Sequence, residues 1–335
     1  MIKILPLCTP PVAGYTYHAF PLSVILLNEN AFPWFYSNYI QLQISLREED
    51  IYFTDFYSYA RRDPGLYPFL HTNKFHRDLY SSKKKFVHFL QEAVSHGHYV
   101  YMFVDEYEIN GRQQHLKNHL THDILIHGVD SENESCHVSG FNQNVVFDRW
   151  EIPIQSLFSG FRHAKVLQDQ HQYICLFQND FTYGYRFQMK NMLALLQDYM
   201  SGTNTSERLS MHVNAYSSND YIFGHRVYDK VFEYLEAVRR HQYKLSIMPF
   251  HILWEHKRTM RQRFEYIDVA DLEHWYEPLR DLEQLAYSIR NRFLKYLVSQ
   301  KSGEWAKARA QLEELKERER KAMHGIIDEL LIRLG

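Results

Sequence analysis

The residues with the clearest chemical potential surround His122. Residues 122–141 read HDILIHGVDSENESCHVSGF, so a histidine opens an apolar run, a Gly-Val-Asp turn follows, and a second strand-like run contains Cys136 and His137. A histidine placed in this way can take a proton from a nucleophile and return it later. A histidine at the start of a strand is also common as an ordinary hydrogen-bonded residue. General-base catalysis by His122 is therefore a hypothesis that needs a nucleophile beside it.

The chain offers three thiols as nucleophiles: Cys8, Cys136 and Cys175. Cys136 and Cys175 lie in the apolar runs SCHVSG and YICLF, which predicts buried, unreactive thiols. Cys8 precedes the first predicted helix across a proline-rich turn and stays open as a nucleophile. Three scattered cysteines are too few for a disulfide framework or a metal knuckle, so we expect a reducing, cytoplasmic environment.

Two other chemistries have weaker support. The run HLKNHLTH places His115, His119 and His122 at spacings of four and three, as zinc ligands on a helix would be. The chain has 20 histidines in 335 residues and no HExxH, so we predict no metal, with this trio as the alternative. No GxGxxG, P-loop or GxSxG motif occurs, and we predict no cofactor.

An acidic group follows the apolar run before His122. Asp105, Glu106 and Glu108 could include a carboxylate pair for glycoside chemistry. On a strand only Glu106 and Glu108 would share a face, because neighbouring side chains alternate. We expect a solvated strand end here.

Hydrophobic periodicity predicts an α+β fold. We expect a short strand over 2–7, a helix over 17–28, aromatic strands or a strand–helix pair over 34–59, and a helix over 83–95. Strands of an antiparallel sheet are predicted over 98–109, 122–130 and 135–142. The sheet is expected to continue to about residue 153, where a helix begins. From residue 223 onward the pattern is mostly helical. We therefore predict an α+β domain over 1–165 and a mostly helical domain over 166–335.

Composition limits the partners. The 38 basic and 40 acidic residues give a net charge of −2, which argues against nucleic acid. No stretch is apolar for long enough to span a bilayer, so no membrane association is predicted.

The order of helix, histidine strand and following strand, together with HDILIHGVDSENESCHVSGF, resembles the papain-like peptidases that process double-glycine leader peptides. It resembles more closely the butirosin biosynthesis protein H N-terminal domain family of bacterial natural-product clusters. The resemblance implies a papain-like fold in the first domain. It also implies acyl transfer from a carrier-protein thioester.

Only some of the catalytic roles that the resemblance implies have a matching residue in this chain. His122 matches the general base, and the turn after it matches at Gly128 and Asp130. The family's nucleophile heads the first helix, where this chain has Tyr17, His18 and Ala19. The place of the orienting acid is taken by Gly140, with Asn142 two residues further on.

Loss of the nucleophile removes the covalent route of acyl transfer. We therefore predict a catalytically degenerate relative that acts as a binding or accessory protein in nonribosomal peptide or polyketide biosynthesis. Its partner would be an acyl-carrier protein, or a peptide or small-molecule acyl substrate. The alternative is an active acyltransferase or amidase that uses His122 with Cys8 or His18 as an unorthodox nucleophile, and with Tyr17 and Asn142 in the same site.

Overall fold

The computed structural model describes residues 2–58, 63–182, 184–208, 216–267 and 272–334. Two compact units divide the chain: a first unit of residues 1–31 and 62–184, and a second unit of residues 32–61 and 185–335. The sequence analysis placed one boundary at residue 165. The division differs because strand β9 (Tyr173–Asn179) pairs within the sheet of the first unit, and because elements among the described residues 32–58 pack with the later helices.

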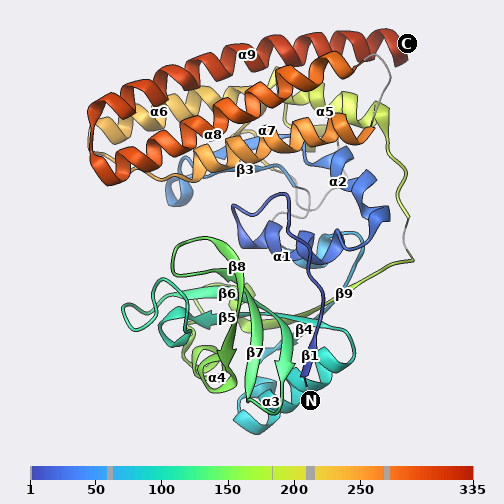
Figure 1. Ribbon diagram of the computed structural model, residues 1–335, viewed down its shortest axis with the longest axis vertical. Coiled ribbons are helices and arrows are strands. Elements are labelled where there is room, and N and C mark those ends of the chain that lie inside the picture. The colour runs from blue at the N-terminus through green and yellow to red at the C-terminus, as the bar shows by residue number, and fades with distance from the viewer. Residues whose placement is uncertain (1, 59–62, 183, 209–215, 268–271, 335) are drawn as a thin grey trace. The chain divides into compact units, whose positions relative to one another are not determined.

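The first unit is built on an antiparallel sheet. Its strands follow the order β4-β9-β5-β6-β7-β8, and β1 pairs with β6 at the same sheet (Figure 1). The remaining bounds are Ile2–Ile4 for β1, Leu70–His76 for β4, Tyr99–Asp105 for β5, Thr121–Asp130 for β6, Ser135–Phe141 for β7 and Phe147–Pro153 for β8. The predicted antiparallel sheet in an α+β fold is confirmed.

Three helices accompany this sheet. Helix α3 (Lys83–Ser95) has the predicted bounds, because the Ser82 side chain accepts a hydrogen bond from the Lys85 amide and caps its start. Helix α4 (Ile154–His163) packs with α3 against β5. Helix α1 (Thr16–Ile25) packs against β7 and β9, and it begins one residue earlier and ends three residues earlier than predicted. Thr16, not Tyr17, is thus its first residue.

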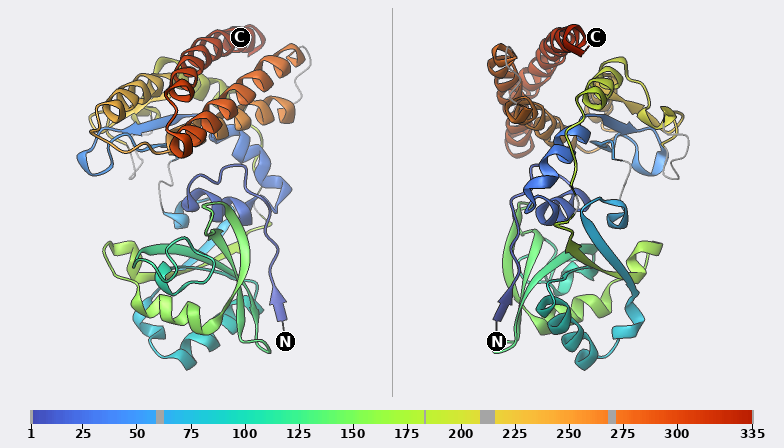
Figure 2. Two further views of the ribbon diagram at one scale, coloured as in Figure 1. Left: turned by 60° about the vertical axis from the view of Figure 1, so that its left-hand side comes forward. Right: turned by 90° about the vertical axis from the view of Figure 1, so that its right-hand side faces the viewer.

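The second unit is mostly helical, as predicted. Its helices are α2 (Phe32–Asn38), α5 (Met189–Ser201), α6 (Val227–Arg239), α7 (Met248–Ile267), α8 (Tyr276–Ser299) and α9 (Ser302–Leu334). The orange α8 and red α9 lie side by side (Figures 1 and 2). A small antiparallel sheet of β10 (Tyr221–Phe223), β2 (Leu42–Ser45) and β3 (Thr54–Phe56) completes the unit. Over the part of the chain that the structure describes, we find no helix with the length and apolarity for crossing a bilayer.

A fully buried ion pair joins the helices of the second unit. The Lys257 ammonium on α7 donates to the Glu319 carboxylate on α9 and, at 3.1 Å, to the Tyr199 hydroxyl on α5. Glu319 also accepts hydrogen bonds from the hydroxyls of Tyr199 and, on α6, Tyr228. Burial alone would raise the pKa of Glu319, but Lys257 and two histidines lower it to about 2. Four helices therefore converge on one carboxylate that stays ionised.

Glu319→Gln should destabilise the second unit by about 3 kcal/mol, because the Lys257 ammonium would stay buried without a counter-charge. Urea unfolding followed by tryptophan fluorescence measures this, since Trp34, Trp254, Trp275 and Trp305 lie in the second unit. Glu317→Gln on the same helix is the control, because Glu317 pairs with Arg320 at the surface and its loss should barely move the midpoint. Equal midpoints for the two variants would contradict this role of the ion pair.

Candidate functional site

The candidate site centres on Asp123 and His122 at the start of β6 in the first unit. The Asp123 carboxylate is buried, and its Oδ1 lies 2.9 Å from Nδ1 of the half-buried His122 imidazole. Its Oδ2 accepts hydrogen bonds from the Thr16 hydroxyl at 2.9 Å and from the Tyr101 hydroxyl at 3.2 Å. One carboxylate thus ties together α1, β5 and β6.

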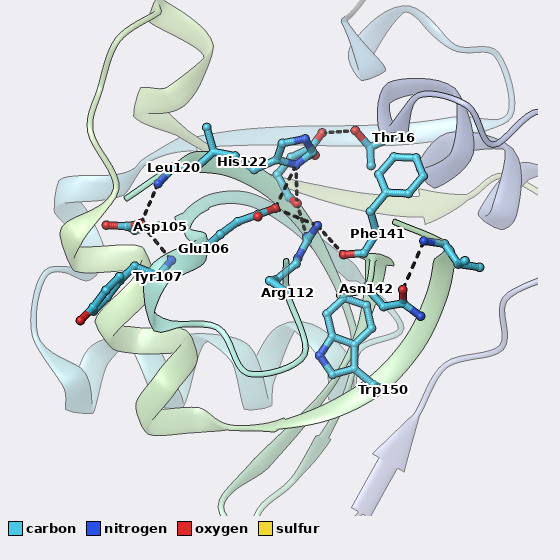
Figure 3. Close-up of polar contacts among 12 residues, drawn as sticks. Thr16, Asp105, Glu106, Tyr107, Arg112, Leu120, His122, Phe141, Asn142 and Trp150 are labelled. Atoms are coloured by element: carbon cyan, nitrogen blue, oxygen red, sulfur yellow. Dashed lines mark hydrogen bonds and ion pairs between the residues drawn. The ribbon is translucent and has the colours of Figure 1, made fainter. Parts of the chain in front are cut away.

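A second buried pair, Glu106 and Arg112, lies beside the first. The two side chains meet close to His122 (Figure 3), with Arg112 Nη1 3.3 Å from Glu106 Oε1. Arg112 also donates to the backbone carbonyls of Phe141 and Asp123. Glu106 Oε1 lies 3.9 Å from His122 Nδ1. The site therefore holds two carboxylates, a guanidinium and an imidazole within one connected network.

Electrostatics shift both members of the central pair toward their charged forms. Burial alone would lower the pKa of His122, but the Asp123 carboxylate outweighs it and raises that pKa above the ordinary value. Burial would likewise raise the pKa of Asp123, yet His122, the Thr16 hydroxyl and Arg112 together lower it. Both shifts favour the charged forms, an imidazolium that donates to a carboxylate.

The same charge state disfavours activation of Thr16. Its hydroxyl, on the first residue of α1, donates to Asp123 rather than being placed for transfer to a neutral imidazole. A carboxylate with a lowered pKa is a weak base, and an aliphatic hydroxyl is a poor nucleophile until it loses its proton. The arrangement suits recognition of a polar group better than covalent catalysis.

Of the catalytic residues predicted with the resemblance, His122 belongs to this network, whereas the contacts described below for His18, Tyr17 and Asn142 lie elsewhere. The buried imidazole of His18 contacts the Tyr67 hydroxyl, with Nδ1 and the oxygen 3.1 Å apart. The half-buried Tyr17 stacks on Tyr15, with ring centroids 5.3 Å apart. Asn142 serves the β7–β8 turn, where its Oδ1 accepts from the amides of Asn144 and Val146 (Figure 3 shows one of these bonds).

The surroundings of the three thiols favour their protonated forms. Cys8 Sγ donates to the Leu22 carbonyl at 3.4 Å, and burial raises the pKa of this thiol to about 11. Burial also raises the pKa of Cys136 to about 12 and that of Cys175 to about 11. A thiol is a good nucleophile only as the thiolate, so none of the three is activated at neutral pH.

The histidines of the alternative zinc site have separate partners. His115 Nδ1 lies 3.0 Å from the Tyr107 carbonyl, whereas His119 Nδ1 lies 2.6 Å from the Asp105 carboxylate. His122 faces Asp123 instead. Within the described ranges, no three His, Cys, Asp or Glu side chains are grouped so that they could hold a metal ion.

The expectation of a solvated acidic strand end is wrong. Strand β5 ends at Asp105, and the chain turns at once into a 3-10 turn, Glu106–Glu108, that carries Glu106 inward to Arg112. Asp105 and Glu106 are both buried, whereas Glu108 pairs with the exposed His163. Glu106 and Glu108 thus have different partners and form no carboxylate pair.

Sequence reasoning missed Thr16, Tyr101, Arg112 and Asp123. One signal was present: Asp123 directly precedes the apolar run Ile124–Ile126, so a carboxylate lies in a strand predicted to be buried. A buried charge of this kind needs a partner. Arg112 has no such signal, because only the structure shows that Gly140 leaves space for it, where a Cβ would lie 2.6 Å from Arg112 Nη2.

No protein-family model matches the chain, and a search of curated proteins finds no match.

Asp123→Asn should lower the pKa of the His122 imidazole relative to the wild type, because burial and the nearby Arg112 would still oppose its charge and only the more distant Glu106 carboxylate would favour it. In the wild type, the pair's contribution to stability is lost as pH rises through the raised pKa of His122, and also as pH falls through the lowered pKa of Asp123. A histidine-selective NMR titration, assigned with His122→Ala, measures both variants. The titration of His98 should not change, and an unchanged pKa of His122 would refute the pairing.

Gly140→Ala should destabilise the first unit by roughly 1–3 kcal/mol, because the added methyl group overlaps the Arg112 guanidinium. Gly184→Ala is a matched control, since a Cβ at Gly184 meets no atom within 4 Å. Urea unfolding followed by circular dichroism compares the two. The role assigned to Gly140 fails if both variants unfold at the same urea concentration.

Proposed function

We propose that the chain is a catalytically degenerate relative of papain-like acyltransferases and peptidases, acting as a binding or accessory protein in bacterial natural-product biosynthesis. The pathway class would be nonribosomal peptide or polyketide synthesis in the cytoplasm. The partner would be an acyl-carrier protein or an acylated peptide or small molecule. This proposal keeps the resemblance carried by residues 122–141 and accounts for the chemistry around His122.

The observation that carries the proposal is the hydrogen bond from Thr16 to Asp123. The resemblance expects a thiol at the head of α1, and the residue there is a threonine whose hydroxyl donates to a carboxylate at 2.9 Å. This bond favours a neutral, hydrogen-bonded hydroxyl. It supports a site that holds a ligand without attacking it.

The His122 imidazole supplies a means of recognition. In its protonated form Nδ1 faces Asp123, and the ring, being half-buried, can still present its Nε2–H to a ligand. A thioester or amide carbonyl would accept a hydrogen bond from that group. Binding of an acyl carbonyl is thus within the chemistry of this site.

The alternative, an active acyltransferase or amidase, has less support. With Cys8 it would need a thiolate, and burial raises the pKa of that thiol to about 11. With His18 it would need an accessible imidazole, and that side chain is fully buried. No contact described here favours either nucleophile.

Incubation with butanoyl-pantetheine tests the proposal. Calorimetry should detect saturable binding, while chromatography should show an intact thioester and mass spectrometry an unmodified protein. His122→Ala should raise the dissociation constant roughly tenfold, as expected for loss of one charge-assisted hydrogen bond. His163→Ala is the control, because His163 pairs with Glu108 outside the network.

Two outcomes would contradict the proposal. An acyl adduct that disappears in His122→Ala would establish the active-enzyme alternative. Absence of binding in the wild type would remove acyl recognition as the function of this site.

A further inference from the structure

A second site is open in the helical unit, among residues that the proposed function does not use. A cavity of about 610 Å³ lies at the carboxyl ends of α6 and α8 and the start of α9. Small-molecule sites commonly occupy roughly 300–1,000 Å³. The apolar and aromatic side chains that line it are Val238, Tyr243, Leu245, Tyr296, Leu297 and Trp305.

The charged side chains of this cavity have one sign. Among the described residues that line it, Arg239, His241 and Lys244 are basic and none is acidic. The chain as a whole is nearly balanced, with 38 basic and 40 acidic residues, so this bias is local. Glu236, one turn back on α6, faces Arg239 at 3.9 Å and offsets part of its charge. Lys244 is exposed and leaves the positive charge at the edge of the cavity.

Helix ends give a competing explanation for these basic residues. Cations are favoured near the carboxyl end of a helix, and α6 and α8 both end here. Each helix end carries only about half an elementary charge, and the amino end of α9 has the opposite sign. Lys244 carries one full charge, and Arg239 adds the part of its charge that Glu236 does not offset. The cavity therefore keeps a net preference for an anion.

Both walls of the cavity are fixed by local structure. On one side the Tyr234 hydroxyl donates to the Lys244 carbonyl at 3.0 Å and accepts from the Ser246 amide. On the other side Trp305 packs edge-on against Tyr296, with ring centroids 5.1 Å apart. Preformed walls reduce the entropy cost of binding.

We propose that this cavity binds an organic anion with an extended apolar body, of the class of fatty-acid carboxylates. The apolar lining would contact the chain of the ligand, and Lys244 with Arg239 would pair with its carboxylate. The volume and the apolar lining exceed what an inorganic anion would use. The site lies wholly in the second unit, so the proposal stands or falls independently of the acyl-binding function at His122.

Sodium dodecanoate at concentrations below micelle formation is the probe. Calorimetry and quenching of Trp305 fluorescence should both detect saturable binding to the full chain, with dodecanol binding more weakly. Lys244→Ala should raise the dissociation constant roughly tenfold. Lys321→Ala removes the same charge from an exposed position of α9 that does not line the cavity, and it should leave binding unchanged.

Leu297→Asp gives a second, independent variant, because it places a negative charge in the wall at a partly exposed position. Binding should be lost while the circular dichroism spectrum stays that of the wild type. Equal affinity for dodecanoate and dodecanol would overturn the anion preference. Dodecanoate binding that survives both Lys244→Ala and Leu297→Asp would overturn the site. Association only with phosphatidylglycerol vesicles would instead identify a membrane-surface patch and overturn the small-ligand proposal.

Discussion

The buried carboxylate of Asp123 is the constraint on which the candidate site depends. A carboxylate taken out of water requires several compensating partners, and Asp123 has Thr16, Tyr101 and His122 around it. These partners come from α1, β5 and β6, so satisfying one charge also fixes the register of three elements. The Asp123 charge therefore both holds α1, β5 and β6 together and raises the pKa of His122. A change that removed the charge would alter both.

The second unit also buries a carboxylate, Glu319, but the groups around that carboxylate are not accessible to a ligand. Glu319 is as buried as Asp123, yet its partners Lys257, Tyr199 and Tyr228 are themselves buried on neighbouring helices. The groups around that carboxylate are enclosed, and their role is to specify how α5, α6, α7 and α9 pack. At Asp123 one partner, His122, is only half-buried. That difference in exposure, more than any difference in residue type, distinguishes a candidate binding group from a structural ion pair.

Local sequence patterns were sufficient to predict helices and strands, but not the contacts among the charged side chains around His122. The bounds of α3 followed from its apolar spacing, and β6 and β7 from their apolar runs, because these signals are short in range. The role of Arg112 could not be inferred in this way. It depends on Gly140 leaving space for the guanidinium and on the turn at Glu106, which lie far apart in the sequence. Only the antiparallel pairing of the strands brings them together.

The position at the head of α1 shows why a sequence pattern and a charge network must be considered together. The pattern identifies a missing thiol, which by itself leaves open whether another group has replaced it. The hydrogen-bond network bears on that question, because the Thr16 hydroxyl donates to the Asp123 carboxylate and an aliphatic hydroxyl is a poor nucleophile until it loses its proton. A thiol at the Thr16 position would behave differently from this hydroxyl. A protonated imidazole stabilises a nearby thiolate, so the raised pKa of His122 would favour ionisation of a thiol, whereas it does not help an aliphatic hydroxyl to lose its proton.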